Sequence, residues 1–303
     1  MINIQVKLFG HNIHINNSLN EYIKSQDGYI PPNITMVNPF ILWNQGYTGK
    51  DVTIAIIDTG CSRHSDLDKN IIGGWNFTAE GKSDDYSDGN GHGTHVAGII
   101  GANGKLKGIA PDSKFLILKV LDKSGNGNME SVVNAVNYAI DKKVNIINMS
   151  LGCPTNVPEL HTAVKRAIDN NIVIVSASGN NGDNNANTYE IDYPSGYNEV
   201  ISVGAIDSMR ISANFTNSNK EVDCIAPGVN IISTSLNNGY IQMDGTSMAS
   251  PHVAGIIALL RQWSTKEFGR VLTESELYAQ LIKNTIDLGI PKTIQGNGLV
   301  CLK

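Results

Sequence analysis

The chain has 303 residues and a formal net charge of −5, and its 23 Lys and Arg residues are scattered rather than clustered. A chain of this length can bury one large core, and an acidic chain without a basic cluster offers no electrostatic surface for nucleic acid or an anionic membrane. No apolar run approaches the roughly 18 residues that span a bilayer. We therefore expect no nucleic-acid and no membrane partner.

The N-terminal residues lack a basic segment followed by an apolar stretch, so they make a poor secretory signal. The cysteines are far apart and show no C-x-x-C spacing for zinc or redox chemistry, at positions Cys61, Cys153, Cys224 and Cys301. A cytoplasmic protein with reduced thiols fits best; the alternative is a mature secreted protein whose signal and propeptide have been removed. Residues 1–40 are Asn-rich at first and contain Pro31-Pro32, and we interpret them as an N-terminal extension of a main domain over 41–303.

Short β-branched runs alternate with helical patterns along the main domain. The runs predict strands at 52–57, 115–120, 144–149, 172–175 and 200–203. The helical patterns cover 130–142, 158–170, 246–263 and 274–283, the last after Thr273 as N-cap. Near-continuous apolar strands belong to parallel sheets with helices on both faces, so we predict a three-layer α/β fold with a mainly parallel central sheet. Active sites of such sheets lie at the carboxyl ends of the strands.

Two polar motifs follow the first strand. Asp58 ends the run 52–57 in Asp58-Thr59-Gly60, where it is either a carboxylate for chemistry or a cap of the next turn. His92 lies in a glycine-rich segment that continues as Gly93-Thr94-His95. Two histidines three apart could bind a metal, but no carboxylate follows in zincin order. We interpret His92 as a general base and His95 as a packed structural residue.

Ser247 begins the apolar helix predicted at 246–263, in Asp244-Gly245-Thr246-Ser247-Met248-Ala249-Ser250-Pro251-His252. A serine at this place is ordinarily an N-cap. The other interpretation is a nucleophile at a helix N-terminus, where amide donors and the helix dipole stabilise a developing oxyanion. A nucleophile, a base and an acid that orients the base form a hydrolytic triad, and Asp, His, Ser is one of the chain orders in which such triads occur.

The three motifs around Asp58, His92 and Ser247 together resemble the signatures of the subtilases. The resemblance implies a serine endopeptidase, a subtilisin-like fold and a catalytic triad of these three residues. It also implies an oxyanion donor at Asn180, in Ser176-Ala177-Ser178-Gly179-Asn180, although an Asn after Gly is often only a turn residue. Extended polypeptide substrates would add a strand between two backbone edges, at Ser150-Leu151-Gly152 and Gly125-Asn126-Gly127. Met129 would then line an outer apolar subsite, or it is ordinary surface packing.

From about residue 30 onward the chain is most similar to the intracellular subtilisins of Gram-positive bacteria, which commonly form homodimers. In that branch an N-terminal Leu-Ile-Pro-Tyr segment blocks the active site. Here the corresponding stretch is Leu8-Phe9-Gly10-His11, without the proline, so an inhibitory role of the extension is an open hypothesis. The expected cellular role is protein turnover; the alternatives are a dedicated processing protease and an inactive scaffold.

No cofactor is needed for this chemistry, but subtilases bind structural cations. The segment 103–107 is shorter than the loop that holds the tight calcium in many subtilisins, and it contains two lysines. A weak calcium or sodium site is implied at the carbonyls of Ser195, Tyr197 and Val200 with the carboxylate of Asp223, which is otherwise a plain loop residue.

Asp192 directly precedes Tyr193-Pro194. By register with the Tyr-Pro pair of the subtilases, the resemblance places Asp192 at the floor of the P1 pocket. A carboxylate there would favour Arg or Lys at P1 through a charge-assisted hydrogen bond. In the alternative interpretation Asp192 points to solvent or binds the backbone of its own loop.

Overall fold

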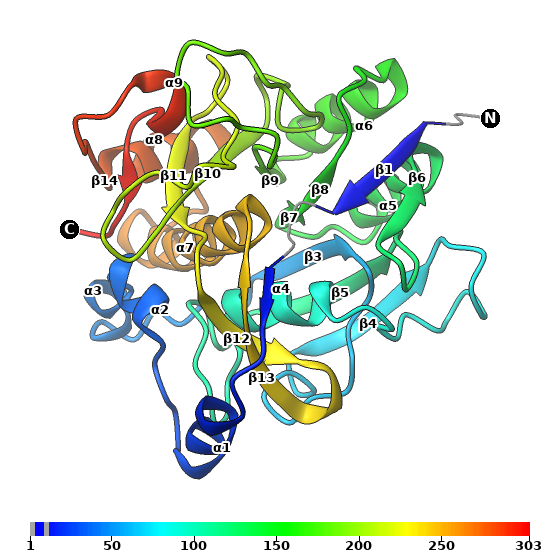
Figure 1. Cartoon of the computed structure of the whole chain (residues 1–303), viewed down its shortest axis with the longest axis vertical. Helices are drawn as coiled ribbons and strands as arrows, with labels where there is room; N and C mark the ends of the chain where they lie inside the picture. The colour runs from blue at the N-terminus through cyan, green and yellow to red at the C-terminus, as the bar shows by residue number, and fades with distance from the viewer. Residues whose placement is uncertain (1–3, 9–11) are drawn as a thin grey trace.

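The computed structural model describes residues 4–8 and 12–303 (Figure 1). Its centre is a nine-stranded sheet. In spatial order the strands are β14 (Thr285–Ile286), β15 (Leu299–Val300), β11 (Cys224–Pro227), β10 (Ile201–Ile206), β9 (Val173–Ala177), β7 (Ile146–Met149), β3 (Thr53–Asp58), β5 (Lys114–Lys119) and β4 (Ile71–Asn76). Every neighbouring pair in it is parallel except the pair formed by the last two strands of the chain, β14 and β15, which is antiparallel.

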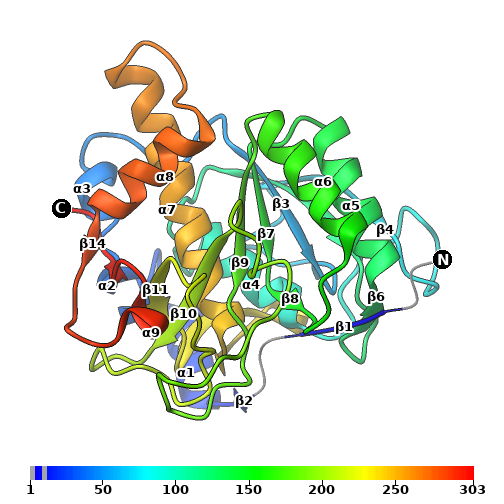
Figure 2. The same cartoon turned by 90° about the horizontal axis from the view of Figure 1, so that it is seen from above.

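Helices cover both faces of this sheet, which gives the three layers expected from the sequence (Figure 2). On one face lie α4 (His92–Gly101) and α7 (Thr246–Glu267), with α8 (Glu274–Lys283) against α7. On the other lie α5 (Met129–Asp141) and α6 (Pro158–Asp169). The fold prediction is confirmed, and the strands and helices predicted from the patterns all form within a few residues of the expected bounds.

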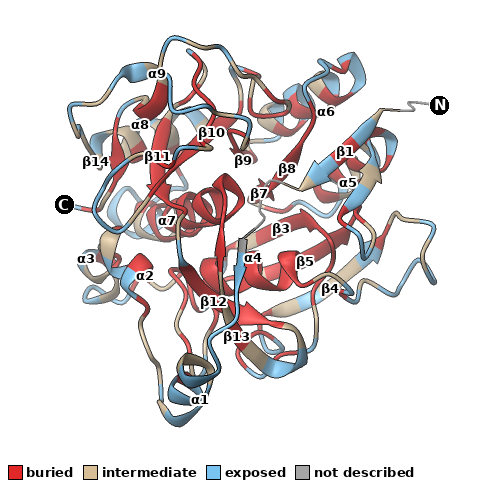
Figure 3. Ribbon diagram, in the orientation of Figure 1, coloured by how far each residue is buried: buried red, intermediate tan, exposed pale blue. Residues whose placement is uncertain are grey.

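Strand β3 shows why a continuous apolar run is needed at the centre. Side chains alternate between the two faces of a strand. Ile54 and Ile56 pack into the core beneath α4 and α7, whereas Ala55 and Ile57 pack into the core beneath α5 and α6. Both faces of β3 are therefore buried, and Figure 3 shows most of its ribbon in the colour of buried residues. The first polar side chain after this run is Asp58, at the carboxyl end of the strand, and it is buried too.

Two small antiparallel sheets lie beside the carboxyl edge of the central sheet. One has the order β6 (Asn126–Asn128), β1 (Gln5–Leu8), β8 (Leu151–Gly152), and the other β12 (Ile231–Ser235), β13 (Gly239–Asp244), β2 (Asn12–His14). The N-terminal extension thus supplies one strand to each. The remaining elements are α1 (Asn17–Ser25), α2 (Pro32–Met36), α3 (Phe40–Trp43), the 3₁₀ turn Leu236–Asn238 and α9 (Lys292–Gln295).

The predicted boundary at residue 40 does not coincide with a break in packing. Ile34 and Val37 are buried in the same core as α7, and the amide of Asn33 contacts the ring of His252 on α7, with Nδ2 and Nε2 3.1 Å apart. Apolar burial continues across residue 40 because α2 and α3 close one side of that core. Asn33, Ile34 and Val37, which belong to the predicted extension 1–40, therefore pack against the core of the predicted main domain 41–303. Among the described helices, none is long and apolar enough to cross a membrane.

Candidate active site

Asp58 and His92 meet at the carboxyl end of β3. His92 Nδ1 lies 2.7 Å from Asp58 Oδ1, and both side chains are buried. The same oxygen accepts a hydrogen bond from Thr59 N at 2.7 Å, so Asp58 caps its own turn and also orients the histidine. A Cβ on Gly93 would lie 2.2 Å from Gly60 O, so only glycine lets α4 approach β3 this closely.

A second buried carboxylate, Asp88, holds these two segments together. Its Oδ1 accepts from the Thr59 hydroxyl at 2.9 Å and from Gly91 N at 2.8 Å, and its Oδ2 accepts from Thr94. Sequence reasoning missed Asp88. Its only signal is its position shortly before the first turn of α4, where an acidic side chain is favourable.

Ser247 is the second residue of α7 and is not an N-cap. Gly245 occupies the cap position, and Ser247 Oγ donates to Ser150 O at 2.9 Å while Ser150 Oγ donates back to Ser247 O at 3.0 Å. His92 Nε2 is buried and has no hydrogen-bond partner among the described residues. The hydroxyl of Ser247 is thus seated on the backbone just before β8, and the nitrogen that would accept its proton is free in the described part of the chain.

His95 lies one turn further along α4 and has a different environment. It is fully buried, its Nε2 is 3.0 Å from Ile231 O, and its own carbonyl accepts from Ser233 Oγ at 2.7 Å. Burial, aided by the nearby His92, lowers the pKa of His95 to about 3, so the ring is neutral at physiological pH. These contacts are those of a packed structural histidine.

Asn180 lies beside the start of α7, after β9. Its Oδ1 accepts from Thr246 N at 3.0 Å and from Thr246 Oγ1 at 2.7 Å, which fixes the amide with Nδ2 left for another acceptor. The N–H of Ser247 belongs to the first turn of α7, where amide donors have no partner within the helix. Thr246 was missed as an orienting residue, although it stands inside the third signature.

The two backbone edges predicted for substrate are joined by a strand of the chain itself. Val6 of β1 pairs with Gly127 of β6, and Lys7 pairs with both Asn126 and Gly152. Val6 is fully buried and belongs to the same apolar core as Met129, the residue around which an outer apolar subsite was expected. Of the stretch Leu8-Phe9-Gly10-His11, only Leu8 lies within the described residues.

The extension also pairs on the other side of Ser247. Leu8, the last residue of β1, lies opposite Leu151, next to Ser150, and β2 begins with Asn12 opposite Asp244. The two strands therefore lie on either side of the segment that carries Ser247, as the path of the N-terminal strands beside β8 and β13 in Figure 1 illustrates.

Asp192 is buried rather than turned to solvent, at 1% exposure. Its Oδ2 accepts from Asn181 Nδ2 at 2.8 Å and from Asn217 Nδ2 at 2.9 Å, and Oδ1 has no partner among the described residues. A Cβ on Gly179 would lie 2.4 Å from Oδ2, so the carboxylate lies directly against the turn that carries Asn180. Burial raises the pKa of Asp192 above its ordinary value. Asn217 is distant in sequence and gave no local signal.

The four residues of the expected cation site are only partly brought together. Val200 and Asp223 line one cavity of about 300 Å³, together with Glu199 and Glu274, but Ser195 and Tyr197 do not line it. Asp223 is already bonded to Ser202 N at 2.8 Å and Tyr278 Oη at 2.7 Å, and burial raises its pKa to about 6. Within the described residues no group of three His, Cys, Asp or Glu side chains could hold a metal.

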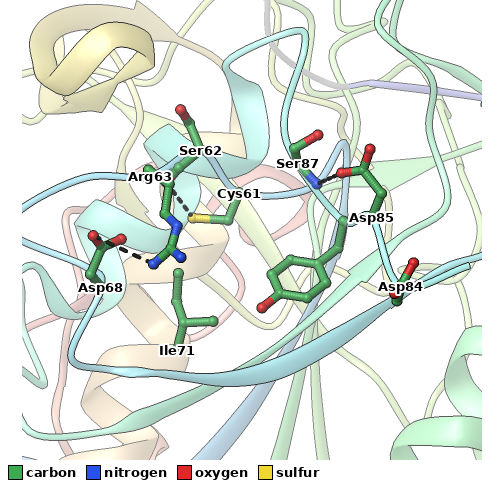
Figure 4. A pocket seen from close by; sticks show the side chains of 9 residues that line it. Cys61, Ser62, Arg63, Asp68, Ile71, Asp84, Asp85 and Ser87 are labelled. Carbon is green, nitrogen blue, oxygen red and sulfur yellow. Dashed lines mark hydrogen bonds and ion pairs between the residues drawn. The ribbon is translucent and has the colours of Figure 1, made fainter. Parts of the chain in front are cut away.

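A separate cavity of about 270 Å³ opens behind the turn that follows Asp58 (Figure 4). Cys61, Arg63 and Asp68 are among the residues that line it, and Arg63 Nη1 lies 3.8 Å from Asp68 Oδ2. Burial raises the pKa of the Cys61 thiol, so little nucleophilic thiolate is present. His92, Asn180 and Ser247 are not among the residues that line this cavity.

Comparison with known proteins agrees with this geometry. The model of the subtilase family matches residues 49–298. The chain is 48% identical over 280 residues to the major intracellular serine protease of Bacillus subtilis, covering 90% of this chain and 88% of the relative. It is 50% identical over 286 residues to an intracellular serine protease of Paenibacillus polymyxa, covering 92% and 87%. It is also 41% identical over 244 residues to subtilisin E of Bacillus subtilis, covering 79% and 62%. With this similarity along most of its length, the chain belongs to the subtilase family and is a subtilisin-like serine endopeptidase.

Proposed function

We propose that the protein cleaves peptide bonds with Ser247 as nucleophile, His92 as general base and Asp58 as the acid that orients the histidine. The observation that carries this proposal is the 2.7 Å contact between His92 Nδ1 and Asp58 Oδ1, since it fixes the tautomer that leaves Nε2 as a proton acceptor. After proton transfer the serine oxygen attacks the scissile carbonyl carbon and an acyl-enzyme forms. The amine leaves with a proton from His92, and water then releases the acyl group.

The developing oxyanion would be bound by Asn180 Nδ2 and by the N–H of Ser247. Thr246 supports this role, because its two hydrogen bonds to Asn180 Oδ1 hold the amide in one orientation before substrate arrives. Donors that are fixed in advance cost no reorganisation during the reaction. Removing one such donor typically lowers kcat about 10²–10³-fold, a figure that comes from subtilisin itself.

The N-terminal extension would act as a built-in inhibitor. Its strands occupy the same backbone edges that an extended substrate needs, with Val6 buried in the same apolar core as Met129. A tethered blocker competes at high effective concentration. Cleavage or displacement of β1 would then open the cleft.

Protein turnover inside the cell is the role that fits best, since two relatives that cover most of the chain are named intracellular serine proteases. A processing protease is the second candidate, and the buried carboxylate of Asp192 gives it support, because a basic P1 requirement would narrow the set of sites. A cleavage profile across a whole proteome separates the two: many sites indicate turnover, and a few sites indicate processing.

Substitution of the nucleophile tests the mechanism. Ser247→Ala should abolish peptidase activity and labelling by a fluorophosphonate, with a thermal transition close to that of the parent. His92→Ala should lose activity to a similar extent, because triad members act as a unit. His95→Ala is the matched control: it should lower thermal stability while the remaining folded protein still reacts with the probe. Full proteolysis by Ser247→Ala would refute the assignment.

A further inference from the structure

The last residue of β13 is Asp244, and its carboxylate contacts β2 of the N-terminal extension. Asp244 stands three residues before Ser247, and β2 of the extension pairs with β13. His14 Nε2 lies 3.1 Å from Asp244 Oδ2. The side chain of His14 is 45% exposed, whereas that of Asp244 is 11% exposed. The extension thus places the imidazole of His14 against the largely buried carboxylate of Asp244.

The protein's own backbone holds this carboxylate. Asp244 Oδ1 accepts a hydrogen bond from Asn230 N at 2.6 Å, and Asn230 lies in a left-handed turn with φ of +55° just before β12. That bond does not involve the extension, so its donor and its acceptor are both present whether or not β2 lies along β13. Opposite charges this close are stabilised mainly when one of them is already held in place, because less side-chain entropy is lost.

Strand geometry tells which part of a substrate meets Asp244. Polypeptide that lies along β6 and β8 reaches Ser247 from the side of β1, and polypeptide that lies along β13 leaves from the side of β2. Since β1 precedes β2 in the chain, a substrate bound in the same direction places its residues after the scissile bond along β13. Side chains at diagonal positions of an antiparallel pair are within reach of each other, as His14 and Asp244 are.

We propose that Asp244 is a specificity residue for the part of the substrate that follows the scissile bond, where it selects a cationic side chain. This inference rests on the proposed use of Ser247 as nucleophile. Arg and Lys keep their charge at neutral pH and form charge-assisted hydrogen bonds with a carboxylate, whereas an acidic residue at the same place is repelled. The preferred substrates are polypeptides with Arg or Lys a few residues after the cleaved bond.

A scanning series of quenched fluorescent peptides tests this. All peptides have the same residues before the scissile bond, and a single Arg is placed in turn at each of the first five positions after it. Each Arg peptide competes in one reaction with the peptide that has Gln at the same position. The ratio of the two kcat/KM values does not depend on how much of the enzyme has its cleft covered. The parent should show one position with a ratio of about two to five. Asp244→Asn, which keeps an acceptor for Asn230 N, should bring that ratio to about one.

Matched controls separate a local contact from the general field of the protein. Asp169→Asn removes one exposed negative charge at the end of α6 and should leave the peak unchanged. Asp244→Ser is a second variant that can still accept from Asn230 N, with thermal melting as the check of folding. A flat scan in the parent, or a peak that survives both Asp244 variants, overturns the inference.

Binding of the same peptides to Ser247→Ala and Ser247→Ala/Asp244→Asn, followed by fluorescence anisotropy, distinguishes the two proposals. An Arg preference that only the Asp244 change removes supports the role of Asp244 whatever the nucleophile is. Equal binding of the Arg and Gln peptides to Ser247→Ala overturns it. Peptidase activity that persists in Ser247→Ala counts against the proposed nucleophile alone.

Discussion

Three largely buried carboxylates of this protein differ in the groups that form hydrogen bonds with them. Asp58 is fully buried and has His92 and Thr59 N as partners, Asp192 has two asparagine amides, and Asp223 has Tyr278 and a backbone N–H. A buried carboxylate is costly unless hydrogen bonds replace its hydration. These residues therefore respond differently to substitution and to pH.

Asp192 should set the preference at P1. In the parent, kcat/KM should be about ten- to a hundredfold higher for Arg than for Leu at P1, equivalent to about 1.4–2.7 kcal/mol. Because burial raises the pKa of Asp192, the preference should grow as pH rises through a value above the ordinary aspartate pKa. Asp192→Asn should remove both the preference and its pH dependence.

Matched P1 peptides assayed from mildly acidic to alkaline pH provide the measurement. Asp183→Asn is the control, because Asp183 is an exposed aspartate in the same connecting segment. A parent that prefers Leu or Phe over Arg would show that the pocket uses Asp192 only as a structural group.

Asp223 should reduce stability at neutral pH. Its pKa is raised to about 6 by burial, so the folded state binds its proton more tightly than the unfolded chain. The free energy of unfolding therefore falls as pH rises from about 4 to 6. Asp223→Asn should raise the free energy of unfolding by about 1–3 kcal/mol at pH 8 and change little at pH 4.

Denaturant titrations at the two pH values measure this, with Asp169→Asn as the exposed comparison. The Asn side chain can still accept from Ser202 N and donate to Tyr278 Oη, so a loss of stability at pH 8 would mean that a bound cation or the charge itself supports the fold.

At the scale of elements, β1 is the segment whose removal should change activity most. Its burial alternates: Val6 is fully buried whereas Gln5 and Lys7 are exposed. The strand is held by ladder hydrogen bonds on both sides and by one apolar anchor.

Val6→Asp should release the strand, because an unpaired carboxylate in an apolar core costs several kcal/mol. We expect kcat/KM for a short peptide to rise at least about tenfold, as it should after removal of residues 1–18. Gln5→Asp introduces the same charge at an exposed position of β1 and should leave activity near that of the parent. Equal activity of all these proteins would make the extension a structural arm.

At the scale of the whole molecule, the segment 103–107, which is shorter than the calcium loop of many subtilisins, donates backbone hydrogen bonds to the buried carboxylate of Asp66. Asp66 accepts from Lys105 N and Leu106 N, each at 2.9 Å, and from Tyr240 Oη at 2.7 Å. Asp66 thus connects the turn after α4 to β13 through hydrogen bonds.

Thermal unfolding with excess calcium and with chelator should therefore differ by only a few degrees. Any calcium effect should depend on Asp223 and follow ligand linkage, so that it increases with the logarithm of calcium concentration and disappears in Asp223→Asn. A very large calcium shift in the parent, or one that persists in Asp223→Asn, would show that another cation site stabilises the fold.

The sequence alone determined the core layers and the catalytic motifs, because both depend on local patterns. The run 52–57 had to be buried on both faces, and Asp58, His92 and Ser247 each stand in a short glycine-containing signature. Strand β4 escaped prediction, since Gly73 and Gly74 interrupt its apolar pattern; a Cβ at Gly74 would lie 2.4 Å from Ile117 O, so only glycine fits beside β5 there.

Only the tertiary structure decided how distant residues are paired. Asn217 donates a hydrogen bond to Asp192, and Tyr240 donates one to Asp66. The extension lies along β6, β8 and β13. No local pattern specifies such contacts, because strand pairing and buried hydrogen bonds depend on which segments the fold brings together. The sequence could therefore point to the groups that we propose carry out the reaction, and the packing of the whole chain determined which polar groups are covered, oriented or shifted in pKa.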